Sequence, residues 1–170
     1  MVPTDVTDTA AATSTLLSQT GWFEDFAVGQ RIRHARQSTL GDVEASFLAK
    51  QAMNTAQAHF NETFLDGHPL GPGRLVFGLA TISTVFGLAA QDTTEHCLTE
   101  LSYDRIRFRA PVRHGDTVSA YTEVIAVADA DRPDAGVVTF QHWGVRQDGV
   151  VVAEGRRTVL IKRKKHWSPS

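Results

Sequence analysis

The sequence predicts an α+β fold in which an antiparallel sheet wraps around one long central helix. Residues 74–90 carry almost no charge and are apolar on nearly every face of a helix, and such a helix belongs inside a protein. The second half of the chain contains four segments rich in β-branched and aromatic residues, separated by turn sequences. This pattern is typical of consecutive antiparallel strands. The sheet has to wrap the helix, because only then do both hide their apolar surface. The four strand segments span residues 98–112, 116–128, 136–147 and 151–164.

The chain before the long helix is expected to supply one strand and one short helix. Residues 30–39 follow a turn at Gly29 and form the strand candidate. Between Asp42 and Ala52 apolar residues recur at helical spacing, with Asp42 as the N-cap. An aromatic cluster in residues 22–26 is expected to pack as a lid on the core. The apolar positions that make the short helix amphipathic are Val43, Phe47, Leu48 and Ala52.

A strand, a short helix, a long apolar helix and a meander of four strands make up an α+β hot-dog architecture. We expect a single domain over residues 21–163, preceded by a disordered leader over residues 1–20 and followed by a C-terminal tail over residues 164–170. One sheet cannot cover the helix completely and leaves exposed edges, so the fold gains by pairing with a second copy. We therefore expect a homodimer or a higher even-numbered homo-oligomer.

The composition excludes several classes of function. With 170 residues and 42% hydrophobic content the chain can bury one sizeable core. A formal charge of −2 supplies no field that would attract nucleic acid or an anionic membrane, and no apolar stretch reaches the roughly 18 residues of a membrane-spanning helix. Cys97 is the only cysteine, so an internal disulfide is impossible and the cytoplasm is the expected compartment. The sequence also lacks the motifs of serine hydrolases, phosphate-binding loops and dinucleotide-binding folds.

Three segments resemble the MaoC-like dehydratases, a family related to the (R)-specific enoyl-CoA hydratases. Asn54–Phe60 (NTAQAHF) resembles that family's D-x-N-P-L-H segment, and Gly73–Leu79 (GRLVFGL) resembles its G-R-I-A-H-G-M segment at the start of the central helix. Phe108–Val118 (FRAPVRHGDTV) resembles its F-x-x-P-V-x-x-G-D-T-L strand–turn–strand element. The resemblance covers Phe23–Lys162 and implies a hydratase or dehydratase acting on an enoyl thioester of CoA or acyl carrier protein. Residues 53–60 are most similar to the branch that acts on methyl-branched dicarboxylic thioesters such as mesaconyl-CoA.

The resemblance implies catalytic roles for Asn54, His59 and Gly78. Adding water to an enoyl thioester needs a held water, a group that takes its proton, a donor for the α-carbon and stabilisation of the enolate oxygen. Where the family has a catalytic Asp this chain has Asn54, which can orient a water but cannot accept a proton at neutral pH. We therefore expect His59 to act as the general acid or base. Gly78 would let the thioester carbonyl approach the free backbone N–H groups at the start of the central helix.

Substrate contacts are expected from Arg74, Phe77 and Leu79, which surround the start of the central helix. Arg74 could contact an anionic acyl group, or it could form a salt bridge to Asp66 or Glu62. Phe77 stands where the family has a histidine before the glycine.

Each catalytic residue also has a purely structural interpretation. His59 could be a hydrogen-bonded interior histidine, Asn54 a helix C-cap, and Gly78 a point of close helix–sheet packing. The three arginines within residues 105–109 alternate along one strand face, where they could meet CoA phosphates but more often form a solvated outer face.

Two other functions stay open. A hot-dog thioesterase usually has a carboxylate on or near the central helix, and residues 74–90 contain none. A catalytically silent hot-dog module, which binds an acyl group or completes a heterodimer, would explain Asn54 in place of Asp. We expect no cofactor and no metal, because the remaining candidate ligands show no metal-ligand spacing. Those candidates are His68, His114, His142 and Cys97.

Overall fold

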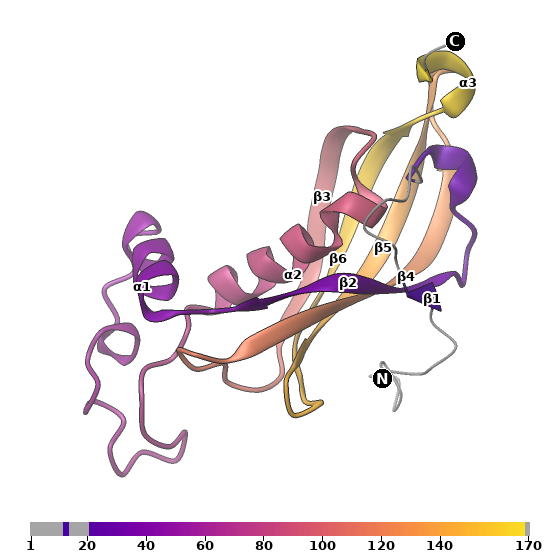
Figure 1. Ribbon diagram of the computed structural model, residues 1–170. Helices are drawn as coiled ribbons and strands as arrows, with labels where there is room; N and C mark the ends of the chain where they lie inside the picture. The colour runs from indigo at the N-terminus through magenta and orange to yellow at the C-terminus, as the bar shows by residue number, and fades with distance from the viewer. Residues whose placement is uncertain (1–11, 14–20, 169–170) are drawn as a thin grey trace.

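The computed structural model describes residues 12–13 and 21–168, which form one curved sheet with a long helix against its concave side (Figure 1). The strands are β1 (Ala12–Thr13), β2 (Arg31–Thr39), β3 (Cys97–Phe108), β4 (Thr117–Asp129), β5 (Ala135–Arg146) and β6 (Val151–Lys162). The helices are η1 (Phe23–Asp25), α1 (Asp42–Gln51), η2 (Gln57–His59), α2 (Gly78–Thr93) and α3 (Lys164–Trp167). The strand order in the sheet is β1-β2-β4-β5-β6-β3, with only β1 and β2 parallel.

This arrangement confirms the hot-dog architecture that the sequence predicts. β2 is the strand expected over residues 30–39, and β3 to β6 are the four strands expected after the long helix. The meander, however, contains only β4, β5 and β6, because β3 pairs with β6 at the far edge of the sheet. Residues 1–20, the predicted leader, lie outside the described residues except for β1. The predicted tail begins with α3, where the Trp167 indole N–H donates a hydrogen bond to the carbonyl oxygen of Asp134 (3.0 Å).

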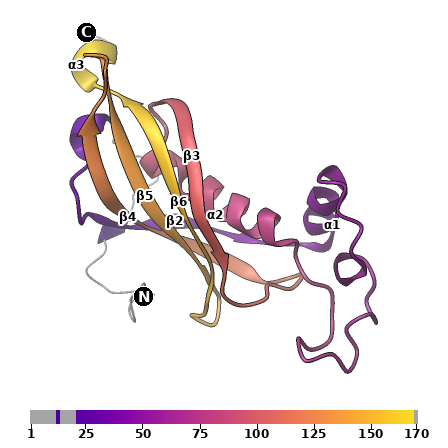
Figure 2. The same cartoon turned by 180° about the vertical axis from the view of Figure 1, so that it is seen from behind.

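The central helix α2 begins four residues later than the apolar stretch and is covered on one side only. Ile82, Val85 and Phe86 pack into the core, and the missing side chain of Gly144 lets the helix approach the sheet, since a Cβ there would lie 2.5 Å from Val85. The opposite side is open: Leu79 is 49% exposed. The expectation that one sheet cannot cover the helix completely is therefore confirmed, because the sheet curves around only one of its faces (Figure 2).

The aromatic cluster near the start of the described chain closes the other end of the core, as expected. Phe23 and Phe26 pack against Phe140 and other buried side chains of β4, β5 and β6. The Phe26 and Phe140 rings meet edge to face, with centroids 5.1 Å apart, a favourable arrangement for aromatic pairs.

Helix α1 buries a different face from the one that its sequence predicts. Ala45 and Ala49 are buried, whereas Val43 and Phe47 are 78% and 57% exposed. Figures 1 and 2 show α1 at the start of α2, beyond the end of the sheet. The small alanine side chains permit close contact there, whereas the described chain covers little of the larger Val43 and Phe47 side chains. The N-cap is Gly41 and not Asp42. The Asp42 carboxylate accepts hydrogen bonds from His114, which lower its pKa most, and from Arg74.

In the described part of the chain, no helix combines the length and apolar character that crossing a membrane takes.

Four polar side chains form a buried row between the sheet and the C-terminal half of α2. His34 Nδ1 donates to the carboxylate of Asp92 (2.6 Å), and His34 Nε2 lies 2.7 Å from the hydroxyl oxygen of Thr122. That hydroxyl lies 2.8 Å from Nδ1 of His142, whose side chain is fully buried. Burial, helped by the charges of His34 and Arg157, lowers the pKa of His142 well below that of free imidazole.

This lowered pKa makes the stability of the fold sensitive to acid. Unfolded His142 binds a proton below about pH 6.5 while the folded form stays neutral, so the free energy of unfolding falls with pH by up to about 1.4 kcal/mol per pH unit in that range. His142→Asn should remove this contribution, giving a flatter dependence than wild type between pH 6.5 and the lowered folded pKa. Urea titrations at several pH values measure the slope. His166→Asn, at an exposed histidine, should keep the wild-type slope; equal slopes for wild type and His142→Asn would contradict the assignment.

Candidate active site

Two hydrogen bonds, one from the His59 ring and one to the preceding residue, hold His59 beside the start of α2. Its Nδ1–H donates to the carbonyl oxygen of Leu75 (2.8 Å), and the Leu75 N–H donates to the carbonyl oxygen of Ala58 (2.8 Å). A carbonyl oxygen only accepts, so Nδ1 carries the hydrogen and the neutral ring keeps its lone pair on Nε2. The ring packs against Phe77, the N-cap of α2, with centroids 5.7 Å apart. A base with a fixed tautomer therefore lies at the N-terminus of the central helix.

Asn54 lies between the C-terminal turn of α1 and the start of η2. The N–H groups of Met53 and Asn54 bond back to Lys50 and Ala49 and close the helix, with Met53 in the left-handed conformation (φ 53°). The interpretation of Asn54 as the C-cap is thus wrong, since Ala52 is the C-cap and Met53 takes the left-handed position after it. The Asn54 side-chain oxygen accepts the N–H of Ala56 (3.0 Å), a contact that does not involve its NH₂ group.

The N-terminus of α2 offers backbone N–H groups without a capping side chain. The first intrahelical bond runs from Thr81 N–H to the carbonyl oxygen of Phe77 (3.1 Å), so the N–H groups of residues 78–80 have no acceptor within the helix. Phe77 is the N-cap residue, and its side chain makes no capping hydrogen bond. Because these N–H groups lie at the positive end of the helix dipole, they can stabilise a developing negative charge.

Gly78 lies against an aromatic ring and beside a cavity. A Cβ at this position would lie 3.0 to 3.2 Å from the ring of Phe108, so close packing accounts for part of the need for glycine. A cavity of about 260 Å³ also reaches Gly78, Thr81 and Leu75. His59 does not line this cavity and is connected to it through the carbonyl group of Leu75. Packing and substrate approach therefore both remain compatible with Gly78.

The three expected substrate-binding residues have different surroundings. Arg74 is paired with Asp42 (2.8 Å) and Glu62 (2.7 Å), which bears out the salt-bridge alternative for Glu62 and leaves Arg74 little charge for a substrate anion. Phe77 contacts the His59 ring. Leu79 is exposed and lines a groove of about 400 Å³ between α2 and β3.

The three arginines within residues 105–109 do not alternate regularly. Arg105 adopts a left-handed conformation (φ 49°) at a bulge of the β3–β6 pair, which breaks the alternation that the sequence predicts. Arg107 and Arg109 both reach Glu154, at 3.4 and 2.6 Å. Their charge is therefore shared with a carboxylate of the sheet.

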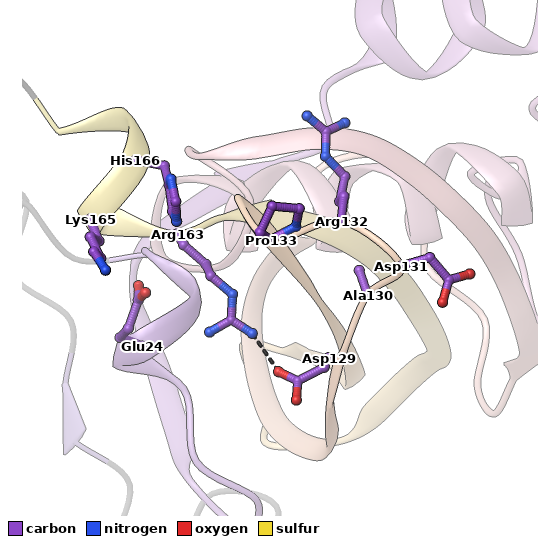
Figure 3. Close-up of a pocket in the computed structure, with 9 residues that line it drawn as sticks. All are labelled: Glu24, Asp129, Ala130, Asp131, Arg132, Pro133, Arg163, Lys165 and His166. Carbon is purple, nitrogen blue, oxygen red and sulfur yellow. Dashed lines mark hydrogen bonds and ion pairs between the residues drawn. The ribbon is translucent and has the colours of Figure 1, made fainter.

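A third hollow, an open cleft of about 620 Å³, lies at the opposite end of the molecule, between the β4–β5 turn and α3. Figure 3 shows that its cationic and acidic side chains are mixed and that Arg163 is bonded to Asp129. Arg132 is likewise held by both oxygens of the nearby Asp134 carboxylate (2.5 and 2.7 Å). Both arginines of this cleft are therefore paired with neighbouring carboxylates.

Two parts of the site could not be predicted from the sequence. The carbonyl group of Leu75 carries no side-chain signal, and only the packing of η2 against residues 75–77 brings it to His59. Arg157 reads as an ordinary strand arginine, yet it lines the groove that begins at Leu79. Within residues 21–168, no three His, Cys, Asp or Glu side chains come together as a metal site requires, and the absence of a metal stays a prediction.

Comparison with known proteins shows the family of the chain. A family model described as mesaconyl-CoA hydratase matches residues 20–163. The β-methylmalyl-CoA dehydratase of Chloroflexus aurantiacus is 32% identical over 154 residues, which are 88% of this chain and 42% of that protein. The (R)-specific enoyl-CoA hydratase of Rhodospirillum rubrum is 29% identical over 143 residues, which are 82% of this chain and 91% of that protein.

A solved structure gives the same result for the fold. The MaoC domain protein dehydratase from Chloroflexus aurantiacus superposes with a TM-score of 0.81 at 27% identity, covering 92% of this chain and 44% of that one. This chain spans about two fifths of the length of the first curated relatives that it matches. Because the family model covers most of its length, the chain belongs to the mesaconyl-CoA hydratase family.

Proposed function

We propose that this protein adds water to, or removes it from, the double bond of an enoyl thioester. The observation that carries the proposal is the hydrogen bond from His59 Nδ1 to the carbonyl oxygen of Leu75. This bond leaves the lone pair on Nε2, and the ring contacts Phe77, the N-cap of the helix whose first N–H groups lack an intrahelical acceptor. A base and an oxyanion-stabilising helix terminus are the two groups that this reaction needs most.

Each step of the reaction is assigned to one residue or group. The NH₂ group of Asn54 orients a water, and His59 Nε2 takes one of its protons while the oxygen bonds to the β-carbon. The electrons of the double bond move to the thioester carbonyl oxygen, which the N–H groups at Gly78 stabilise. His59 then returns the proton to the α-carbon, and dehydration follows the reverse course. Phe77 and Leu79 border the acyl group on either side of Gly78.

The substrate is a CoA or acyl carrier protein thioester. The family model and the names of the curated relatives support CoA and an acyl group of the mesaconyl type. An acyl carrier protein is the alternative carrier.

Incubation with crotonyl-CoA and with mesaconyl-CoA tests this function. Loss of the enoyl absorbance without release of free thiol is the expected result. Release of thiol would identify a thioesterase, against which the structure offers an argument: the acidic residue of α2, Asp92, is buried and bonded to His34. No change with either substrate would favour a silent acyl-binding module and contradict the proposal.

Asn54→Asp is expected to raise the hydration rate on a simple enoyl-CoA. An Asp side chain can keep the hydrogen bond to Ala56 and adds a carboxylate that can accept a proton. Steady-state kinetics with crotonyl-CoA measures the change. Asn61→Asp is a matched control, because Asn61 makes the same type of turn with Thr63 (3.1 Å), and it should leave the rate unaltered. An unchanged or lower rate for Asn54→Asp would show that the amide itself is adapted to the reaction.

We also propose that two copies pair along β3. This strand forms an edge of the sheet and exposes three large apolar side chains, and such an edge favours association. The first curated relatives are more than twice as long as the matched region, which leaves room for a second unit of this size. Light scattering should give the mass of a dimer, and the mass of a single chain would contradict the pairing. The exposed apolar residues of β3 are Leu101, Tyr103 and Phe108.

A further inference from the structure

The cavity that reaches Gly78 takes one of its walls from a long loop. Residues 61–73 follow η2 and extend beyond the end of the sheet, near the turn between β3 and β4 (Figures 1 and 2). Leu70, in the second half of this loop, lines the cavity of about 260 Å³ together with Gly78 and Thr81 of α2. Leu70 is nevertheless 46% exposed. A ligand in the cavity can therefore still cover apolar surface on Leu70.

Arg113, in the turn between β3 and β4, ties this loop to the rest of the protein. Its Nη1 donates to the carbonyl oxygen of Gly73 (3.0 Å), and its Nη2 donates to the carbonyl oxygen of Leu70. Within the described chain, the other hydrogen bonds of residues 63–73 stay inside the loop. A planar guanidinium holds two acceptors in a fixed relative geometry. The position of Leu70 therefore depends on the side chain of Arg113.

The backbone of Arg113 is fixed independently of its side chain. Its N–H donates to a carboxylate oxygen of Asp116 (2.7 Å), and the residue pairs with Leu75 in an isolated antiparallel bridge. The Leu75 N–H also donates to the carbonyl oxygen of Ala58 (2.8 Å). Removing the Arg113 side chain would leave these bonds in place, together with the bond from His59 to Leu75. The side chain therefore acts on the loop and not on His59.

A glycine at position 71 gives the guanidinium room to reach the loop. Gly71 has a left-handed backbone (φ 77°), and a Cβ there would lie 3.1 Å from Nη2 of Arg113. Gly67, in the same loop, is also left-handed (φ 73°), but a Cβ at Gly67 would meet no described atom within 4 Å. An alanine would strain the backbone similarly at both positions. Only the alanine at position 71 would also displace Arg113.

We infer that Arg113 is a positioning residue, which holds Leu70 in place as a wall for the acyl group in the cavity at Gly78. The inference rests on the proposed function, because it takes the thioester carbonyl to lie at Gly78. Arg113 does not itself line the cavity, so it acts on the ligand through Leu70. Without its two hydrogen bonds the loop moves away, and the acyl group loses an apolar contact.

Calorimetry with butyryl-CoA, an unreactive saturated thioester, and with free CoA tests the inference without turnover. Arg113→Ala and Leu70→Ala should each weaken the binding of butyryl-CoA by about 3- to 10-fold, the gain expected from partly burying a leucine side chain. The affinity for free CoA, which has no acyl group, should stay within about twofold. The double variant should bind butyryl-CoA as Leu70→Ala does, because two residues that act through one contact are not additive.

Gly71→Ala and Gly67→Ala form a matched pair. Gly71→Ala should reproduce the weaker binding of butyryl-CoA, and Gly67→Ala should keep the wild-type affinity, because only the former displaces Arg113. If Arg113→Ala does not fold, this pair decides the question. Wild-type affinity for butyryl-CoA in Arg113→Ala would overturn the inference. An equal loss for free CoA, additive losses in the double variant or no binding of butyryl-CoA by the wild type would overturn it as well.

The outcomes also separate this inference from the proposed function. A wild-type protein that hydrates crotonyl-CoA, with unchanged butyryl-CoA binding in Arg113→Ala, would keep the function and remove the role of Arg113. The expected losses of affinity in a protein that hydrates no enoyl-CoA would keep the role of Arg113 in acyl binding and remove the proposed reaction.

Discussion

Replacing His59 with asparagine should lower the rate of enoyl-thioester hydration by about 100- to 10,000-fold, the usual contribution of a general acid or base. The asparagine NH₂ group can still donate to the carbonyl oxygen of Leu75, as Nδ1 of His59 does (2.8 Å), so the link between η2 and the start of α2 is kept. The basic Nε2 is lost, and nothing in the new side chain accepts a proton. Initial rates with crotonyl-CoA and mesaconyl-CoA measure the effect on kcat.

The same variant separates catalysis from structure. Its melting temperature and its mass in light scattering should match those of the wild type. His68→Asn changes an exposed histidine of the same loop region and should keep full activity. Wild-type kcat in His59→Asn would remove His59 from the reaction.

Replacing Gly78 with valine should lower kcat/KM by about a hundredfold or more, comparable to the loss of an oxyanion donor. The new side chain would fill the space in front of the N–H groups of residues 78–80, where the proposed reaction needs the thioester carbonyl. Gly78→Ala should have a smaller effect, because the nearest neighbour of its Cβ is the ring of Phe108, at 3.0 to 3.2 Å, and that ring is half exposed and free to shift.

Phe108→Ala distinguishes the two roles of Gly78. If glycine were needed only for packing against the ring, removing the ring in a Gly78→Val, Phe108→Ala double variant would restore the rate. We expect no recovery, because the valine still blocks the helix terminus. Full recovery in kinetic assays of the double variant would assign Gly78 to packing alone.

The strands and the fold class follow from local sequence, but the limits of α2 do not. β-branched residues and turn sequences place β2 and β4 to β6 correctly, since each signal lies within the strand or its turn. Residues 74–77 are nearly as apolar as the helix that follows, and Phe77 is an N-cap without a capping side chain. No local signal marks the start of α2, which is fixed by contacts such as Val76 N–H to the carbonyl oxygen of Val112 (2.8 Å).

The same distinction applies to side chains. Apolar periodicity predicts that Val43 and Phe47 of α1 are buried, but the contact with the rest of the fold selects Ala45 and Ala49. The segment containing His59 can be found from its resemblance to a family, whereas the partner of His59, a backbone carbonyl group sixteen residues away, cannot. The surroundings of Arg157 likewise cannot be predicted from the sequence, because they depend on Glu100 and Tyr103 of the neighbouring strand β3.

Hydration in water enriched in the heavy oxygen isotope tests the role of His59 most directly. Mass spectrometry should find one heavy oxygen atom in the hydroxyacyl-CoA formed from mesaconyl-CoA or crotonyl-CoA by the wild-type protein, and almost none formed by His59→Asn in the same time. Labelled product accumulating equally fast with both proteins, or unlabelled free thiol in place of a hydroxyacyl product, would contradict the proposed reaction.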